Sequence, residues 1–216
     1  MKVETASGLI LRTRPLTETS LIVHWLTPEL GRLATVAKGA RRPKSPFTGR
    51  LDLFYLADFS FSRSRRSDLH NLREVKLLET HPAIRQDMAK LHQAAYATAF
   101  IDQATETETP LPEIFTLARM FLKQLDREPA RPLNVFAWEI KLLRELGLEP
   151  DYEDSRLTPG TKKIAQALAN KNWGQILRVR TTSAQDDELR RWLHGFLIFH
   201  LDRLPRGRAG AVAGDS

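Results

Sequence analysis

The hydrophobic pattern of this chain changes its period near residue 80. Before that point, β-branched, aromatic and aliphatic residues form five short runs, separated by turn-like segments, and the fourth run alternates apolar with polar residues as half-buried strands do. These runs occupy residues 8–14, 20–27, 31–37, 51–62 and 69–78. Five short strands suit a small closed barrel, because closure removes exposed strand edges. We therefore predict a β-barrel domain over residues 1–80.

After His81-Pro82 the apolar residues recur every three or four positions, which is the spacing of a helix face. This spacing predicts helices around residues 84–95, 114–125 and 136–143, and a fourth from Thr158. The third should end at Gly147, since glycine readily adopts the positive φ of a helix cap. The fold class is then α+β, with a β-barrel followed by an all-helical domain over residues 81–205.

The last predicted helix should begin at Ser183, with Asp186 three residues later in a variant of the capping box. Its apolar stripe consists of Leu189, Leu193, Phe196 and His200. The tail from 206 to 216 is rich in glycine and alanine, and we expect it to be disordered.

Positive charge is concentrated in the predicted barrel. The whole chain has a net charge of +7, and residues 1–80 hold 14 Lys and Arg against 8 Asp and Glu, a net charge of +6. Residues 30–51 contain no acid at all but six cations: Arg32, Lys38, Arg41, Arg42, Lys44 and Arg50. A basic run is usually a solvated surface, but one that no neighbouring acid neutralises favours a polyanionic partner.

The Lys-Ser pair that ends AKGARRPKS (37–45) resembles the end of a nucleotide-binding P-loop, but the match fails. That motif needs glycines six positions before the lysine and directly before it. Lys38 and Pro43 occupy those two places. Proline has no backbone N–H to offer a phosphate and its φ is fixed. We therefore predict that the chain hydrolyses no nucleotide.

Other functional classes are disfavoured by composition. The chain has no cysteine, which excludes disulfides and cysteine-ligated zinc. The first ten residues carry Glu4 and no long apolar run, and no stretch approaches the roughly 18 apolar residues of a membrane span. The six histidines form no ligand cluster, and no catalytic arrangement follows from residue order. We expect a cytoplasmic protein with no cofactor, metal or catalytic site, and no membrane partner.

Three stretches carry a resemblance to a known family. They are GLILRTRPLTETSLIVHWLTPELGRLATVAKGARRPKSPFTGRLDLF (8–54), FAWEIKLLRELGLEP (136–150) and LHGFLIFHLDRLPRGR (193–208). The first contains Ala-Lys-Gly-Ala-Arg-Arg-x-x-Ser, which is the most specific of the three. Through these stretches the sequence resembles the RecO family of bacterial DNA repair and recombination mediators.

The resemblance implies an N-terminal OB-fold barrel and a helical domain that binds partners. It also implies binding of single- and double-stranded DNA, annealing of complementary strands, association with the nucleoid, and cooperation with RecR, single-stranded-DNA-binding protein and RecA. Many relatives carry a Cys-x-x-Cys pair soon after the Leu-Gly-x-x-Pro element. Ser155 and Thr158 stand at about those positions here, so the sequence resembles the variety without zinc.

The candidate DNA-binding residues lie in the first strand and the basic run. Arg12 and Arg14 share one face of the first strand and would extend the site, although a solvated strand face explains them equally well. Two phenylalanines, Phe47 and Phe54, are candidates for stacking on bases, with a role in the core as the alternative. The candidate phosphate contacts are Lys38, Arg41, Arg42, Lys44 and Arg50.

Two functions from different classes remain open. The first is a non-enzymatic DNA mediator, in which the barrel binds phosphates and the helical domain binds proteins. The second is an adaptor whose basic loop docks an acidic partner or an anionic membrane surface. Within the mediator hypothesis, the resemblance implies that the helical domain binds the acidic, apolar-tipped tail of single-stranded-DNA-binding protein. Arg203, Arg206 and Arg208 are the cations that follow its last apolar stripe.

Overall fold

The structure is a computed structural model that describes residues 2–153 and 155–213. The chain divides into two compact units. One comprises residues 1–81 together with 105–119, and the other comprises residues 82–104 together with 120–216. The boundary after His81 lies one residue from the expected one, but the segment 105–119, expected in the helical domain, groups with the barrel.

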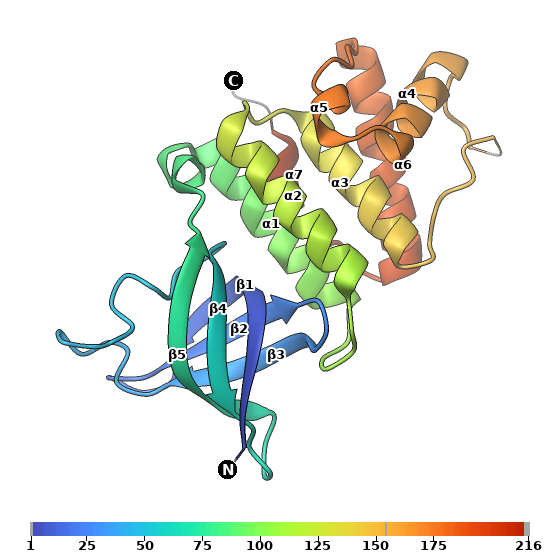
Figure 1. Cartoon of the computed structure of the whole chain (residues 1–216). Coiled ribbons are helices and arrows are strands. Elements are labelled where there is room, and N and C mark those ends of the chain that lie inside the picture. Colours follow the sequence, from blue (N-terminus) through green and yellow to red (C-terminus); the bar gives the residue numbers. More distant parts are fainter. Residues whose placement is uncertain (1, 154, 214–216) are drawn as a thin grey trace. The chain divides into compact units, whose positions relative to one another are not determined.

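Five strands form a closed barrel in the order β1-β2-β3-β5-β4, with β4 returning to pair with β1 (Figure 1). All neighbours are antiparallel except β3 and β5, which are parallel. This arrangement is the predicted OB-fold. The strands are β1 (Val3–Pro15), β2 (Leu21–Thr27), β3 (Gly31–Ala37), β4 (Leu56–Ser62) and β5 (Leu69–Glu79).

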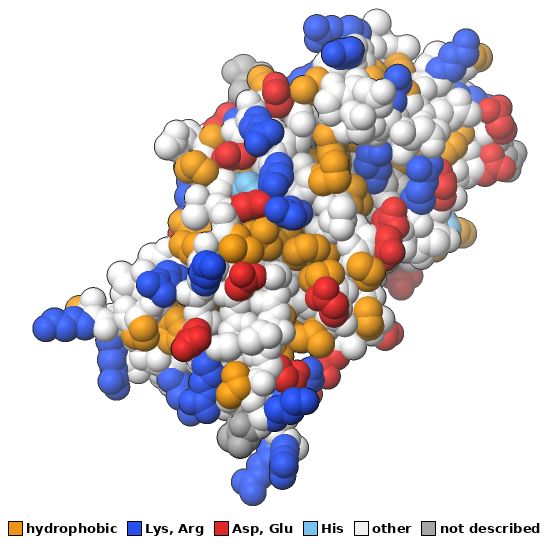
Figure 2. Space-filling view, in the orientation of Figure 1, with side chains coloured by type: hydrophobic (Ala, Val, Ile, Leu, Met, Phe, Trp, Pro, Cys, Tyr) orange, Lys and Arg blue, Asp and Glu red, His pale blue; other side chains and the backbone are white. Residues whose placement is uncertain are grey.

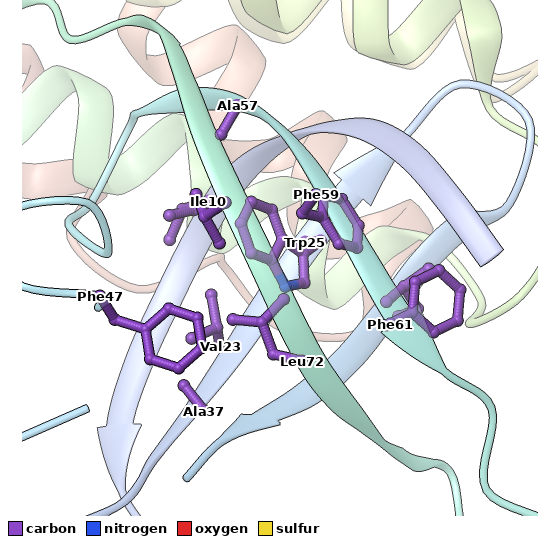
Figure 3. Close-up of a cluster of buried hydrophobic side chains, with 11 residues drawn as sticks. Ile10, Val23, Trp25, Ala37, Phe47, Ala57, Phe59, Phe61 and Leu72 are labelled. Atoms are coloured by element: carbon purple, nitrogen blue, oxygen red, sulfur yellow. The ribbon is translucent and has the colours of Figure 1, made fainter. Parts of the chain in front are cut away.

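Aromatic stacking organises the interior of the barrel (Figure 3). The rings of Trp25 and Phe59 stack with centroids 4.0 Å apart, and Phe61 lies next to Phe59 at 5.7 Å. The buried indole N–H of Trp25 donates to the hydroxyl of Thr35 at 2.8 Å, so this polar group is satisfied within the core. The inward side chains of β2 and β4 are therefore fixed relative to each other.

The fourth strand begins later than its sequence indicates. We expected residues 51–62 to be extended, but β4 starts at Leu56. The side chain of Asp52 accepts a hydrogen bond from the backbone N–H of Leu53 at 2.8 Å, and Phe54 has a φ of 66°. A side chain that bonds its own backbone in this way favours a turn over a strand. Residues 52–55 consequently form a turn that hydrogen-bonds to Ile10 of β1.

The segment 105–119 belongs with the barrel because its backbone pairs with the end of the β2–β3 hairpin. The N–H of Glu108 donates to the carbonyl of Arg32, and the N–H of Leu111 donates to that of Pro28, both at 2.9 Å. Gly31 has a φ of +63°, and a Cβ at this position would lie 1.8 Å from the carbonyl oxygen of Thr109. Only glycine permits this close approach.

In the helical unit, α3 is the central helix and packs against α1, α4, α5, α6 and α7. It ends as predicted, with Gly147 at a φ of +73° and the N–H of Leu148 bonded to the carbonyl of Leu143 at 2.8 Å. A 3-10 helix, η1 (Pro82–Gln86), precedes α1. The helices are α1 (Met88–Ala104), α2 (Pro112–Arg127), α3 (Pro132–Glu145), α4 (Pro159–Asn170), α5 (Trp173–Ile176), α6 (Ser183–Leu201) and α7 (Arg208–Val212).

Two expectations about the C-terminal region are wrong. The cap of α6 is Thr182, which forms a reciprocal capping box with Gln185, one residue earlier than the predicted Ser183. The tail expected to be disordered from 206 instead contains α7, in which Arg208 is buried. Residues 214–216 lie outside the described part of the chain.

The apolar stripe of α6 also differs from its prediction. Leu189 and Leu193 are buried as expected, but the next buried position is Leu197. Phe196 is half-buried and His200 is exposed. Two side chains of the predicted stripe are therefore outside the buried core of the helical unit.

Candidate nucleic-acid interface

Residues 38–50 form the first part of the connection between β3 and β4 and are called the basic loop below. The loop is built of consecutive turns: the N–H of Arg42 donates to Gly39, that of Ser45 to Arg42 and that of Thr48 to Ser45, at 3.1, 3.1 and 3.2 Å. Gly39 adopts a φ of +70°, which suits glycine at a turn. The basic loop therefore has a defined conformation and is not an unstructured arm.

Arg41 attaches the basic loop to the connection between β1 and β2. Its backbone N–H donates to the carbonyl of Thr19 at 3.0 Å, and its Nη1 donates to the carbonyl of Thr17 at 3.2 Å. The side chain nevertheless remains exposed. These bonds hold the Arg41 guanidinium at the surface.

Phe47 anchors the basic loop from below. It is only 7% exposed and packs in the barrel core near Val23 and Ala37 (Figure 3). Phe54 is 2% exposed. Neither ring is available to stack on a base, so the prediction that these two residues stack on DNA is wrong. The physical reason is that the loop folds back onto the barrel and the turn at 52–55 directs Phe54 inward.

The five candidate phosphate contacts of the basic loop are exposed. Within the described part of the chain, none of them forms an ion pair. In Figure 2, Lys and Arg side chains project from the tip of the barrel that this loop forms in Figure 1. The five are Lys38, Arg41, Arg42, Lys44 and Arg50.

Other arginines of the same unit are engaged in structural pairs. Arg63 contacts Glu4 at 3.2 Å and Glu108 at 2.9 Å, and the hydrogen bond that it donates to Glu4 contributes most to raising the pKa of this guanidinium. Arg119 pairs with Glu79 at 2.5 Å. The barrel thus places acids next to these cations and leaves the basic loop without them.

Arg12 and Arg14 lie on β1, outside the basic loop. Both are exposed, and Arg12 lies opposite His24 with a ring-nitrogen contact of 3.5 Å. Arg14 lies three residues before Thr17, and the carbonyl of Thr17 accepts the hydrogen bond from the Arg41 side chain. These two arginines therefore extend the exposed positive surface along β1, as the strand pattern predicts, and their contact with DNA stays a prediction.

Sequence reasoning missed two cations in the β4–β5 connection. Arg65 and Arg66 are both exposed, in a loop where Ser64 and Ser67 form local hydrogen bonds. The segment SRRS was interpreted only as a turn. Its position between the last two strands of an OB-fold is the signal that could have identified it, because this loop often contacts oligonucleotides.

A hollow of about 670 Å³ crosses the outer face of β1, β4 and β5, but its charge is mixed. Arg50 and Lys76 line it together with Asp58 and Glu74. A surface that carries both cations and acids attracts a polyanion less strongly than the basic loop, which carries cations alone. The strands themselves are therefore the weaker candidate for phosphate contact.

Around α6 the helical unit carries an aromatic groove of about 810 Å³. Phe199, 81% exposed, lies beside Phe196 and Trp192 in this groove. Arg156 and Arg191 also line it. The arginines expected for such a site were Arg203, Arg206 and Arg208, but Arg208 is buried and Arg203 and Arg206 do not line the groove.

The hydroxyls of Ser155 and Thr158, where the resemblance implies a cysteine pair in many relatives, form hydrogen bonds within the protein. Ser155 donates to the carbonyl of Tyr152 at 2.6 Å, and Thr158 donates to Glu188 at 2.8 Å. Among the described residues there is no group of three or more His, Cys, Asp or Glu side chains that could hold a metal ion. No helix in residues 2–153 or 155–213 is long and apolar enough to cross a membrane.

A closed five-stranded barrel with an exposed, unpaired cationic loop defines the class of OB-fold modules that suit polyanions. Comparison with known proteins gives the family. Residues 1–81 match the family model described as Recombination protein O N terminal, and residues 85–155 match the one described as Recombination protein O C terminal. The chain belongs to the RecO family.

Three relatives illustrate the similarity, each named DNA repair protein RecO. The protein of Listeria monocytogenes is 28% identical over 207 residues, which cover 94% of this chain and 80% of the relative. That of Exiguobacterium sibiricum is 32% identical over 148 residues, or 68% of this chain. That of an Anaeromyxobacter species is 33% identical over 144 residues, or 67%. In the latter two, the match spans 59% and 56% of the relative's length.

Proposed function

We propose that this chain is a non-catalytic mediator of DNA repair that binds DNA through the basic loop. The observation that carries the proposal is the set of five exposed loop cations without an acidic partner among the described residues. Such cations neutralise phosphates and release condensed counterions, a large favourable term in DNA binding. Membership of the RecO family, with relatives named DNA repair proteins, supports DNA as the polyanion.

The activity proposed for the bound state is annealing of complementary strands. Two single strands repel each other through their phosphates, and a surface that neutralises both lowers that barrier. We further propose that the chain binds both single- and double-stranded DNA and acts with RecR and RecA. Its role is to help load RecA onto DNA that single-stranded-DNA-binding protein has coated.

The helical unit is proposed to bind the acidic tail of single-stranded-DNA-binding protein. The aromatic groove on α6 supports this assignment, because an apolar tip needs exposed aromatic surface and the acids need nearby guanidinium groups. Phe199 supplies the first, and Arg156 and Arg191 supply the second. The Leu189 and Leu193 side chains are buried in the unit and take no part.

An adaptor that docks an acidic partner through the basic loop is the alternative. Salt dependence does not separate the two functions, since both are electrostatic. Strand annealing does. Two complementary oligonucleotides, one labelled with a donor and the other with an acceptor fluorophore, should pair faster when the chain is added. Unchanged annealing at protein concentrations that saturate the oligonucleotides would reject the mediator and favour the adaptor.

A further inference from the structure

A small hollow of about 350 Å³ lies beneath the basic loop. Its inner wall is apolar: Phe47 is buried, and Leu21, Leu51 and Tyr55 are half-buried. All three half-buried side chains pack against the barrel core, so the wall is fixed by the fold. The inner wall of the hollow is therefore apolar and preformed.

The rim of this hollow is cationic. Arg41 and Arg42 both line it and both are exposed. Arg41 is held in place by its bonds to Thr17 and Thr19. The acid that lines the hollow, Asp52, accepts a bond from the N–H of Leu53 within its own turn. The hollow thus has an apolar inner wall and guanidinium groups at its mouth. These features suit a ligand in which a flat apolar ring is attached to an anion.

A nucleotide of a single strand has this chemistry. Its base presents an aromatic face, and its phosphates lie on either side along the backbone. The volume is at the lower end of the range for small-ligand sites, about 300–1,000 Å³, which suits one base and not a stacked series. In a duplex the base is already paired, and extruding it costs a few kcal/mol.

We propose that this hollow takes one unstacked base of single-stranded DNA, while Arg41 and Arg42 contact the phosphates on either side of it. The inference rests on the proposed function and adds to it a source of strand preference. Single strands supply the base without breaking a pair, whereas a duplex contacts the cations alone. Two aromatic rings line the hollow, and since Phe47 is buried, we assign contact with the base to the half-buried ring of Tyr55.

The test compares a short oligothymidylate with an oligomer of equal length whose sugar-phosphate backbone carries no bases. Affinities are measured for the wild type, Tyr55→Leu, and Phe199→Leu as a control that removes an aromatic ring from the helical unit. We expect the wild type and Phe199→Leu to bind the oligothymidylate at least about fivefold more tightly than the baseless oligomer, the lower end of what one stacked base contributes. Tyr55→Leu should lose most of that ratio and keep its affinity for the baseless oligomer.

The outcomes separate the inference from the function on which it rests. Equal and tight binding of both oligomers by the wild type overturns the base site and leaves phosphate binding intact. If neither oligomer binds, the DNA-binding proposal itself fails. Should Tyr55→Leu unfold, the wild type still provides a test with an oligonucleotide that carries one 2-aminopurine. Its fluorescence should change on saturation, and unchanged fluorescence would reject the inference.

Discussion

Arg208 and Glu139 form a buried ion pair across 69 residues of sequence, with Nε and Oε1 2.7 Å apart. Their side chains are 5% and 0% exposed. The hydroxyl of Tyr96 donates to the same carboxylate at 2.6 Å. The contact attaches α7 to α1 and α3, so the end of the described chain is part of the helical core.

Removing one partner of this pair should destabilise the helical unit strongly. We predict that Arg208→Met lowers the free energy of unfolding by about 3–5 kcal/mol, because Glu139 is left buried without its counter-charge. Denaturant titration followed by circular dichroism measures the change. The double variant Arg208→Met with Glu139→Gln should recover part of the loss. A single variant as stable as the wild type would mean that α7 does not hold the unit together.

The environment of Tyr96 predicts how the stability of the protein changes at alkaline pH. Burial raises the pKa of its hydroxyl well above the ordinary value, and the neighbouring Glu139 carboxylate raises it further. In the unfolded chain a tyrosine ionises near pH 10. The unfolded state therefore loses this proton first, and the stability that neutral Tyr96 contributes is present below about pH 10 and declines as the pH rises toward the folded pKa.

The test is a comparison of unfolding free energies for the wild type and Tyr96→Phe between neutral pH and about pH 11. Phenylalanine does not ionise, so the variant should lose stability less steeply above pH 10. Lysine side chains titrate in the same pH range in both proteins, so their contribution cancels when the two unfolding free energies are compared. Parallel curves for the two proteins would show that Tyr96 ionises normally in the folded state.

Gly31 should tolerate no side chain. We predict that Gly31→Ala costs about 2 kcal/mol or more, since alanine is strained at a positive φ and its Cβ would overlap the carbonyl of Thr109. Gly195→Ala is the matched control, because this exposed helical position has no atom within 4 Å of the added Cβ. That change should stabilise by about 0.5–1 kcal/mol. The melting temperatures of both variants, compared with that of the wild type, test the prediction, and an unchanged melting temperature for Gly31→Ala would contradict it.

The aromatic groove on α6 is tested with an acidic peptide that has an apolar C-terminal tip. Phe199→Ala should weaken binding of this peptide to the full chain by about fivefold or more, because exposed aromatics often dominate such contacts. Ile198→Ala removes a neighbouring exposed side chain that does not line the groove, and it should change little. Equal effects of the two substitutions would place the peptide elsewhere.

The sequence correctly predicted the ends of elements that depend on neighbouring residues. The third strand spans the predicted residues, Gly31–Ala37, and α3 stops before Gly147 because a glycine there completes the cap. Resemblance supplied the OB-fold and the family. The start of β4 was missed because the side chain of Asp52 accepts a local hydrogen bond from the backbone, which favours a turn despite the β propensity of the residues that follow.

The remaining errors concern contacts between residues that are distant in the sequence. Nothing near Arg208 reveals that its partner is Glu139, so α7 was interpreted as a disordered tail. Phe47 lies among cations and was considered a candidate for stacking on bases, with a role in the core as the alternative; the basic loop folds it into the barrel. The composition of that loop predicted its charge, while the absence of acidic partners for its cations in the described chain needed the structure.

The central proposal, that the basic loop binds DNA through its unpaired cations, is tested most directly by the salt dependence of single-stranded DNA affinity. The comparison includes Arg41→Glu with Arg42→Glu, and Arg178→Glu with Arg180→Glu as a control of equal charge change at exposed sites of the helical unit. If about four phosphates are neutralised, log affinity should fall against log salt with a slope near −3. We predict that the loop variant binds more weakly and flattens the slope by roughly one unit, while the control keeps the wild-type slope. An unchanged slope in a correctly folded loop variant would contradict the proposal.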